Sequence, residues 1–445
     1  MQVIKFGGTS IGSVEAIKST VEIITNSPSQ VIVVFSAFSG VTNLLSDINS
    51  FIEAGKLETA NQTLEVINAR HENVINDLFD DGAHRIEALH TLDKHIEVIS
   101  AQINENLSEF NPKEILAQGE LLSSQIIYAY FDSRSLDASL IQALDFMRIN
   151  ESDEPDHEQI TKLLEQTLEG NNCKYIITQG YICRNISGQI DNLKRGGSDY
   201  SAALIGVAIG AEVIQIWTDI DGLHNNDPRF VAGTQPINKL SFEEAAELAY
   251  FGAKVLHPQS ILPAKEKNVP VLLKNTFAPE RPGTLIQKQA FVKGVRAIAA
   301  KDGITSIKIK SYRMLMSYGF LKNIFEVFEK HKTSIDVITT SEVGVSLTID
   351  DTDHLDKIVE QLQRIGEVTV EDQLSVVCVV GYFPEELTGQ SAKILTALKD
   401  IPVKMISFGG SLHNVSLIIN SADKLEALNS LHQHFFVEQK ELIEA

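Results

Sequence analysis

The amino-acid sequence predicts an α/β domain with a largely parallel sheet, followed by two small domains of the ferredoxin-like βαββαβ type. In the first part of the chain, short apolar runs that end at small residues alternate with helical patterns, as buried parallel strands and their helices do. In the last part, Val345–Ile349 and Val415–Ile419 mark a weak repeat at an offset of 70 residues. Each copy reads strand, helix, strand, strand, helix, which is the ferredoxin-like arrangement.

The predicted elements of the first part follow one another in a regular order. The strands are residues 2–6 and 30–36, Tyr175–Thr178, Val213–Trp217 and Val269–Leu273, and the clearest helices are Tyr200–Ile209 and Phe242–Phe251. Residues 41–131 are mostly helical by pattern, which predicts a helical subregion beside the sheet. The turn signal Arg281–Thr284 precedes a change in character, so we expect a domain boundary near residue 288.

Composition limits the classes of function. The formal net charge of −21 argues against a surface for nucleic acid or anionic membranes. No apolar run approaches the length of about 18 residues that a membrane helix needs. The N-terminus carries no signal-peptide pattern, so we expect a cytoplasmic protein. No Ser-His-Asp order and no His/Cys cluster supports hydrolytic or zinc chemistry, and we assign no metal-ligating residues.

Two predicted strands end in glycine-containing turns. Lys5–Ser10 places a lysine and two glycines before hydroxyl residues, so backbone N–H groups and a point charge could meet a phosphate. The Walker spacing is absent, and taken alone the segment is more typical of a tight turn. Ser36–Leu45 follows the second strand and opens a helix, at the sheet edge where α/β proteins bind ligands. Its alternative interpretation is a Ser or Thr N-cap.

Two further segments place charged residues beside glycine. Gln118–Glu120 lies in a helical pattern, where Glu120 could meet an ammonium group or could be a solvated helix carboxylate. In Lys194–Ala203, an arginine that can bind a carboxylate through two hydrogen bonds precedes paired glycines. Ser198 or Asp199 is expected to cap the helix that follows, and the N-terminus of that helix favours anions.

Later segments repeat this chemistry. Trp217–Leu223 and Asn226–Arg229 offer hydroxyl, carboxylate and turn residues after another strand. Phe251–Pro258 brings a second lysine beside a glycine, and we expect its histidine, His257, to be structural.

In this order the segments resemble the monofunctional aspartate kinases of the amino acid kinase family, over essentially the whole chain. The motifs are KFGGTS, SAFSGVTNLL, QGE, RGGSDYSAAL, WTDIDG with NDPR, and FGAKVLHP. The resemblance implies a three-layer α/β/α kinase domain over residues 1–288. It implies ATP-dependent phosphorylation of the L-aspartate side chain to 4-phospho-L-aspartate, the first step of lysine, threonine and methionine biosynthesis. ATP would be used with Mg²⁺, which we expect the nucleotide phosphates to hold.

The resemblance also implies roles for the motif residues. Lys5 and Asp199 would be catalytic, and phosphate would be bound by Lys5, Gly7, Gly8 and Ser198. Aspartate would lie among Ser36, Ala37, Thr42, Glu120 and Arg195, with Arg195 on its α-carboxylate and Glu120 on its α-ammonium. ATP would be contacted by Thr218, Asp219, His224, Arg229 and Lys254. Close relatives often carry a tyrosine where this chain has His224.

The C-terminal repeat, residues 289–445, resembles tandem ACT domains, which in this family bind amino-acid effectors at a dimer interface. One unit interrupts the other, which places the first at about 303–372 and the second at about 292–300 plus 373–445. Likeness to the lysine-sensitive type favours lysine over threonine, and it assigns the effector to Met314, Ser317, Phe320, Leu321, Ser334, Ile335, Asp336, Ser341 and Glu342. The alternative is that Asp336 and Glu342 are surface and turn residues of a structural dimer module. We expect a homodimer or a dimer of dimers.

Two other functions remain open at this point. A kinase of the same superfamily could act on glutamate, N-acetylglutamate, carbamate or a nucleotide, but the ACT repeat and Gln118–Glu120 argue against it. A non-catalytic effector-binding protein is a different class, and the intact Lys5, Arg195, Asp199 and Lys254 argue against that. The length leaves no room for a fused homoserine dehydrogenase, so we expect a single activity.

Overall fold

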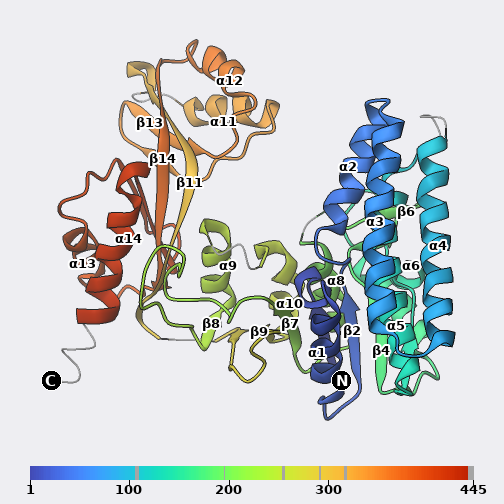
Figure 1. Ribbon diagram of the computed structural model, residues 1–445. Coiled ribbons are helices and arrows are strands. Elements are labelled where there is room, and N and C mark those ends of the chain that lie inside the picture. Colours follow the sequence, from blue (N-terminus) through green and yellow to red (C-terminus); the bar gives the residue numbers. More distant parts are fainter. Residues whose placement is uncertain (106–109, 195, 253–255, 290–291, 315–317, 439–445) are drawn as a thin grey trace. The chain divides into compact units, whose positions relative to one another are not determined.

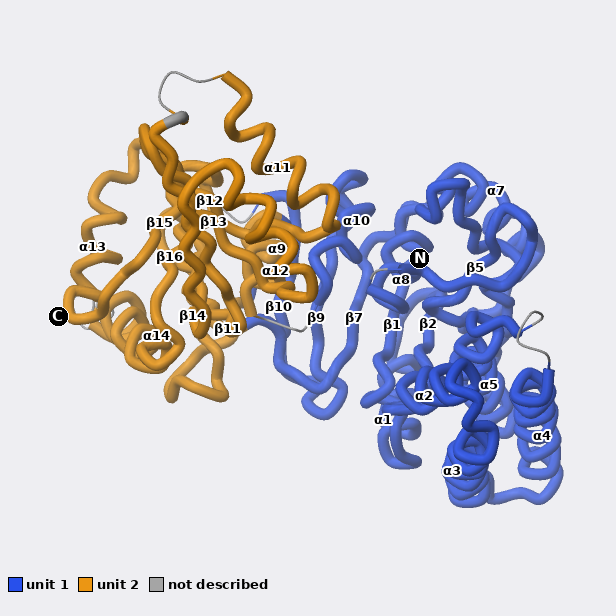
Figure 2. Tube along the Cα trace, turned by 90° about the horizontal axis from the view of Figure 1, so that it is seen from above, with its two compact units in different colours: residues 1–223, 238–242, 255–290 blue, residues 224–237, 243–254, 291–445 orange. Residues whose placement is uncertain are grey.

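The computed structural model describes residues 1–105, 110–194, 196–252, 256–289, 292–314 and 318–438. The chain forms two compact units (Figure 2). The first unit comprises residues 1–223, 238–242 and 255–290, and the second comprises 224–237, 243–254 and 291–445. Residues 224–237 and 243–254, which lie within the expected kinase domain, cluster with the second unit because they contact its sheet. The N–H of Ile298, for example, donates to the carbonyl of Asn225 at 2.9 Å. The domain limits inferred from the sequence stay a prediction.

An eight-stranded sheet forms the centre of the first unit, with the order β3-β4-β2-β1-β7-β9-β10-β8 (Figure 1). Its strands are β1 (Gln2–Phe6), β2 (Val31–Phe35), β3 (Ala138–Leu140), β4 (Tyr175–Gln179), β7 (Ile214–Thr218), β8 (Lys239–Ser241), β9 (Val271–Asn275) and β10 (Thr284–Gln287). The first six strands of this order are parallel, and β10 is antiparallel to β9. The predicted α/β fold with a largely parallel sheet is confirmed.

Helices cover both faces of this sheet, so its strands are rich in apolar residues, and β2 and β4 are buried along their whole length. The helices are α1 (Val14–Thr25), α2 (Val41–Glu53), α3 (Leu57–Leu78), α4 (Gly82–Asn104), α5 (Pro112–Ser133), α6 (Ala143–Phe146), α7 (His157–Leu168), α8 (Gly197–Ala208) and α10 (Leu262–Lys267). On one face, Ile4 and Phe6 join a core that includes residues of α1 to α5. On the other face Val3 lies against α8, where a Cβ on Gly206 would stand 3.7 Å from the Val3 side chain. Because side chains alternate along a strand, Lys5 points to the same face as Val3, toward α8.

Helices α2 to α5 form the predicted helical subregion (Figure 1). Each of them packs against the next, and their apolar faces extend the core of the sheet. A short hairpin, β5 (Ile182–Arg184) with β6 (Ile190–Asn192), completes the first unit. Throughout the described part of the chain, every helix is too short or too polar to span a lipid bilayer.

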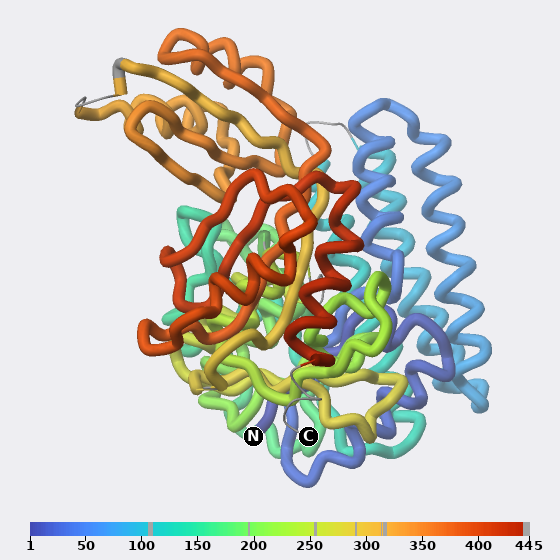
Figure 3. Tube along the Cα trace, turned by 90° about the vertical axis from the view of Figure 1, so that its left-hand side faces the viewer, coloured from blue at the N-terminus to red at the C-terminus, as the bar shows by residue number. Residues whose placement is uncertain are grey.

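The second unit contains a six-stranded antiparallel sheet with the order β12-β13-β11-β14-β16-β15. Its strands are β11 (Gly294–Lys310), β12 (Ile338–Thr340), β13 (Gly344–Ile349), β14 (Glu367–Tyr382), β15 (Met405–Phe408) and β16 (Asn414–Asn420). Strands β11 and β14 run through both halves of this sheet, and their pairing shifts register between Lys301 and Ser306. Figure 3 shows the two halves as an orange and a red lobe joined by long strands.

Each half of this sheet has its own helices and its own core. The helices are α11 (Phe320–Lys330) and α12 (Leu355–Leu362) in one half and α13 (Gln390–Ala397) and α14 (Lys424–His432) in the other, with α9 (Phe242–Phe251) also in contact with this unit. The repeated segments occupy corresponding places, since Ile324 lies in α11 and Ile394 in α13, and each is buried in its own core. The predicted pair of ferredoxin-like folds is confirmed.

Candidate active site

The two predicted catalytic residues meet at the end of β1. The Lys5 Nζ lies 2.6 Å from the Asp199 Oδ1, with the two side chains only 11% and 15% exposed. Lys5 comes from the central strand, and Asp199 comes from the first turn of α8, which packs on that strand. A cation held this close to a carboxylate in a nearly dry site is oriented more strongly than an exposed pair would be.

The turn after β1 is packed directly against the turn after β2. A Cβ on Gly8 would lie 2.8 Å from the Ala37 carbonyl oxygen and 3.0 Å from the Ser39 nitrogen, so only glycine fits there. The Ser39 N–H donates to the Gly8 carbonyl at 3.2 Å, and the Ser36 N–H donates to the Phe6 carbonyl at 3.3 Å. The segment expected to bind phosphate and the segment expected to bind aspartate are therefore packed and hydrogen-bonded to each other.

Glu120 is buried beside both turns. The residue is only 3% exposed. Its Oε2 has no hydrogen-bond partner among the residues that the structure describes. Burial raises the pKa of the Glu120 carboxyl to about 8, while the backbone N–H groups of Ala37 and Glu120 and the Lys5 charge act in the opposite direction. An ammonium group placed on this carboxyl would favour its ionised form, so the residue is suited to bind a cationic ligand.

Glycine, rather than a side-chain cap, begins both helices that follow these turns. Gly40 starts α2 with φ 77°, and Gly196 starts α8 with φ 66°, both left-handed. The predicted cap by Ser198 or Asp199 is wrong, as is the Ser or Thr cap considered for α2, because left-handed backbone at the cap position favours glycine. Ser198 and Asp199 lie in the first turn of α8 instead, and Thr42 lies in the first turn of α2. Arg195 lies outside the described residues.

Gln118 faces away from this cluster. Its Oε1 is hydrogen-bonded to the ring Nδ1 of His95 on α4 at 2.6 Å. Gly119 next to it permits close packing, since a Cβ there would stand 2.9 Å from the Ala37 side chain. Of the three residues in this motif, Glu120 carries the charge and the other two fit α5 against its neighbours.

Tyr181 lies beside the start of α8, since a Cβ on Gly197 would stand 3.7 Å from its ring, and it was not predicted from the sequence. Its backbone has φ 66°, an uncommon value for a residue with a side chain, and its N–H donates to the Ser201 Oγ at 2.8 Å. Burial raises the pKa of its phenol to about 12, and the charge of Glu120 acts in the same direction. Tyr181 follows the end of β4, so the reasoning applied to the ends of β1 and β2 could have found it.

The predicted ATP-binding residues are divided between the two units. In the first unit, Thr218 at the end of β7 donates through its hydroxyl to the Asp219 carboxylate at 3.1 Å. In the second unit, the His224 ring is half-buried and lies 3.2 Å from the Thr234 hydroxyl, and burial lowers its pKa. Lys254 lies outside the described residues. His257, expected to be structural, accepts a hydrogen bond from the Gln259 N–H at 3.2 Å.

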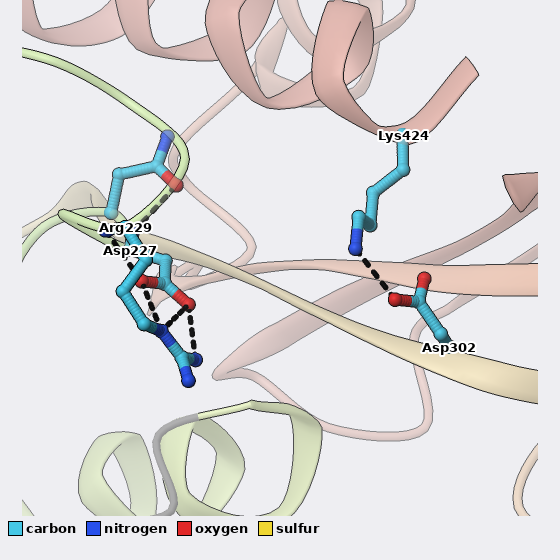
Figure 4. A network of polar contacts seen from close by, with 5 residues as sticks. Asp227, Arg229, Asp302 and Lys424 are labelled. Atoms are coloured by element: carbon cyan, nitrogen blue, oxygen red, sulfur yellow. Dashed lines mark hydrogen bonds and ion pairs between the residues drawn. The ribbon is translucent and has the colours of Figure 1, made fainter. Parts of the chain in front are cut away.

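Arg229 has an exposed guanidinium, and Figure 4 shows it turned toward Asp227. Its Nε donates to the Asp227 Oδ1 at 2.9 Å, and its side chain is 66% exposed. In the same view Lys424 on α14 pairs with Asp302 at 2.6 Å. The exposed ion pair between Arg229 and Asp227 contributes little to stability, and an anionic ligand could break it.

The predicted effector residues lie in the half of the second unit that contains α11. Phe320 is in its core, and Met314 and Ile335 pack against that core. Leu321, Ser334, Ser341 and Glu342 are exposed. Ser317 lies outside the described residues.

Asp336 differs from the other predicted effector residues because it is a half-buried carboxylate that a residue of α9 contacts. The Tyr250 hydroxyl donates to its Oδ1, while its Oδ2 is unpartnered within the described ranges. Burial raises the pKa of this carboxyl, and Asp350 adds to the effect, whereas Tyr250 and Lys301 oppose it.

Comparison with known proteins agrees with this geometry. The model of the amino acid kinase family matches residues 1–275, and an ACT domain model matches residues 377–435. The lysine-sensitive aspartokinase 3 of Escherichia coli is 32% identical over 451 residues, which cover 97% of this chain and 98% of that protein. The chain belongs to the aspartokinases of the amino acid kinase family.

Solved structures of an aspartokinase superpose on nearly the whole chain. Aspartokinase III of E. coli in complex with aspartate and ADP (R-state) has a TM-score of 0.82 at 31% identity, covering 98% of this chain and 100% of the other. The same enzyme in complex with lysine and aspartate (T-state) has a TM-score of 0.79 at 32% identity, covering 98% and 99%. The aspartokinase fold, including its ACT region, is therefore shared.

Proposed function

We propose that this chain transfers the γ-phosphoryl group of ATP to the side-chain carboxylate of L-aspartate, giving 4-phospho-L-aspartate and ADP. The observation that carries the proposal is the buried Lys5–Asp199 ion pair beside the buried carboxyl of Glu120. The E. coli relative with aspartate and ADP bound supports the same pair of ligands. The reaction would be the first step of lysine, threonine and methionine biosynthesis.

Aspartate is proposed to bind with its α-ammonium on Glu120 and its α-carboxylate on Arg195. The Ser36–Gly40 turn and Thr42 would hold the reacting side chain near the N-terminus of α2. Tyr181 is added to this set, because its phenol is coupled to the charge of Glu120. Binding the ammonium would convert Glu120 from its protonated to its ionised form, so substrate binding near neutral pH releases a proton.

The chemical step needs no general base, because the attacking carboxylate is already ionised at neutral pH. One carboxylate oxygen of aspartate forms a bond to the γ-phosphorus while the bond from that phosphorus to the β,γ-bridging oxygen breaks, and ADP leaves with the electron pair. Lys5 and the backbone N–H groups of Gly7 and Gly8 would balance the charge on the transferred group. Asp199 and Ser198 would hold this arrangement, Asp199 by fixing the Lys5 ammonium.

ATP is proposed to contact Thr218, Asp219, His224, Arg229 and Lys254. Within the part of the chain described here, no group of three or more His, Cys, Asp or Glu side chains could hold a metal ion. Mg²⁺ is proposed to be held mainly by the nucleotide phosphates, where it would neutralise phosphate charge.

The ACT region is proposed to bind L-lysine as an inhibitor, with Asp336 and Glu342 as partners of the cationic effector. The E. coli relatives that are named for lysine sensitivity or contain lysine support this choice. We also propose a homodimer or a dimer of dimers formed through the ACT domains, and a cytoplasmic location.

An ADP-release assay with ATP and Mg²⁺ tests the catalytic proposal. Aspartate should support turnover, and hydroxylamine should trap the acyl phosphate as a hydroxamate. Glutamate, N-acetylglutamate and carbamate should give no more than background. Turnover with one of those acceptors in place of aspartate would refute the assignment of substrate.

A further inference from the structure

Helix α3 carries one polar side chain in an otherwise apolar buried stripe. The stripe consists of Ala60, Leu64, Ile67, His71, Ile75 and Leu78. His71 is fully buried, and its ring Nδ1 lies 2.7 Å from the Ile67 carbonyl oxygen. A carbonyl can only accept, so Nδ1 carries the proton. Burial lowers the pKa of this imidazole to about 4, which makes the ring neutral at physiological pH.

The neutral ring lies flat against the turn proposed to bind aspartate. The ring centroids of His71 and Phe38 are 5.1 Å apart with an interplanar angle of 13°. Phe38 is 1% exposed, so this contact is sealed from solvent. Phe38 lies between Ala37, whose carbonyl meets Gly8, and Gly40, the left-handed cap of α2. Helix α3 therefore packs against this turn through the Phe38 ring.

A second residue of α3 reaches the same turn. A Cβ on Gly40 would stand 3.5 Å from an Nη atom of Arg70, which directly precedes His71. Two consecutive residues of α3 thus lie against this turn, Arg70 near Gly40 and His71 on Phe38. A histidine that only filled core volume could be replaced by an apolar residue with no functional effect. The ring Nε2 has no hydrogen-bond partner among the described residues, and burying an unsatisfied polar atom costs about 1–3 kcal/mol, which makes a purely space-filling role an expensive one.

We propose that His71 is a positioning residue for substrate binding, which sets the Ser36–Gly40 turn by stacking on Phe38. The inference rests on the proposed function, because that turn is assigned to aspartate there. His71 itself does not touch substrate. Through this stacking contact, the helical subregion α2 to α5 contributes to the affinity for aspartate.

The test compares His71→Leu with His71→Phe in the full-length enzyme. Leucine introduces an apolar side chain without a flat ring, whereas phenylalanine keeps a ring that can stack. His71→Leu should raise the KM for aspartate about tenfold, since a small displacement of a positioned substrate is costly. His71→Phe should stay within about threefold of the wild type, and the KM for ATP should stay nearly constant in both. Ile75→Val, one turn along the same buried stripe, is the control for a general loss of core packing.

The stack can also be removed from its other side. Phe38→Leu should raise the KM for aspartate to a similar extent, and the double variant with His71→Leu should be no worse than either single variant. Phe38→Leu and His71→Phe still decide the matter if His71→Leu folds poorly, because neither requires that variant. A folded His71→Leu enzyme with a wild-type KM for aspartate would overturn the inference, as would additive effects in the cycle. Equal increases in the KM for both substrates would also overturn it, because that pattern indicates a general structural role. If the wild type fails to turn over aspartate, the proposed function falls and the inference falls with it.

Discussion

Each unit of the molecule contains a carboxyl group that the proposed function assigns to an ammonium ion, fully buried in the first unit and half-buried in the second. Glu120 lies in the first unit and Asp336 in the second, and burial raises the pKa of both. Each has one oxygen that is unpartnered within the described residues. A lysine charge lowers the pKa of each, Lys5 at Glu120 and Lys301 at Asp336. They differ in their hydrogen-bond donors, since Glu120 accepts from backbone N–H groups whereas Asp336 accepts from the Tyr250 hydroxyl.

The difference suits the Glu120 site to catalysis and the Asp336 site to reversible binding of a regulatory ligand. Around Glu120, the contacts are backbone N–H groups and a lysine held by its own carboxylate partner, so they persist whether or not a ligand is bound. Around Asp336, the contact is the hydroxyl of a partly exposed tyrosine, which an incoming cation could displace. A permanent cation suits phosphoryl transfer, and an exchangeable phenol suits a regulatory ligand.

The largest effect is expected from removing the permanent cation. Lys5→Ala should lower kcat by at least about a thousandfold, because a single charged donor at a transferred phosphoryl group is worth that much or more. The fold should stay intact because the backbone pairing of β1 is untouched, but the melting temperature should fall because Asp199 loses its partner in a largely buried site. Lys18→Ala, at an exposed position of α1, is the matched control and should keep full activity. A near-normal kcat in Lys5→Ala would refute the catalytic assignment.

The next largest effect is expected at Glu120. Glu120→Gln keeps the shape of the side chain but cannot form a charge-assisted hydrogen bond to an ammonium. We expect kcat/KM for aspartate to fall about 10- to 100-fold, while the KM for ATP stays nearly constant. Glu22→Gln, an exposed carboxylate on α1, is the control. An unchanged KM for aspartate would show that the substrate ammonium lies elsewhere.

The same carboxyl predicts a pH dependence with a definite sign. In the substrate-free protein its pKa is raised from 4.5 to about 8, so the stability that protonation contributes is present below 4.5 and is lost as the pH rises toward 8. An ammonium ligand favours the ionised form, so the affinity for aspartate should increase as the pH rises from 6.5 to 8. Titration calorimetry in two buffers should detect the released proton. In Glu120→Gln this slope should disappear, and a slope that survives would assign the titration to another group.

Much of this site could be predicted because its residues lie in short sequence segments at the ends of predicted strands. Lys5 and Ser36 sit at the ends of apolar runs, and the ends of parallel strands meet at one edge of a sheet. The helix caps were predicted wrongly because hydroxyl side chains beside Gly196 suggested a cap, whereas the backbone there is left-handed. No local pattern could show that Tyr250 contacts Asp336, because these residues are 86 positions apart and their contact depends on how α9 packs. The same limit hid the stacking of His71 on Phe38.

A smaller effect, confined to regulation, is expected at Asp336. Asp336→Asn should raise the lysine concentration needed for half-maximal inhibition about tenfold, since the ion pair with the effector is lost while the side-chain shape is kept. Asp353→Asn, an exposed carboxylate in the same half of the unit, is the control. The measurement is inhibition at fixed aspartate and ATP, repeated with threonine. Inhibition by threonine and not by lysine would correct the effector, and unchanged lysine inhibition in Asp336→Asn would correct its binding site.

The smallest effect is expected from the phenol that covers Asp336. Tyr250→Phe removes the hydroxyl that donates to the Asp336 carboxylate and leaves the aromatic ring, over which the Lys301 ammonium lies 4.9 Å from the centroid. If lysine displaces this hydroxyl, its loss should tighten inhibition about threefold, the worth of one modest hydrogen bond. If the hydroxyl instead orients Asp336 for the effector, Tyr250→Phe should weaken inhibition, as Asp336→Asn does. The sign of the change therefore decides whether Asp336 is an exchangeable carboxylate or, like Glu120, a carboxylate whose neighbours stay in place.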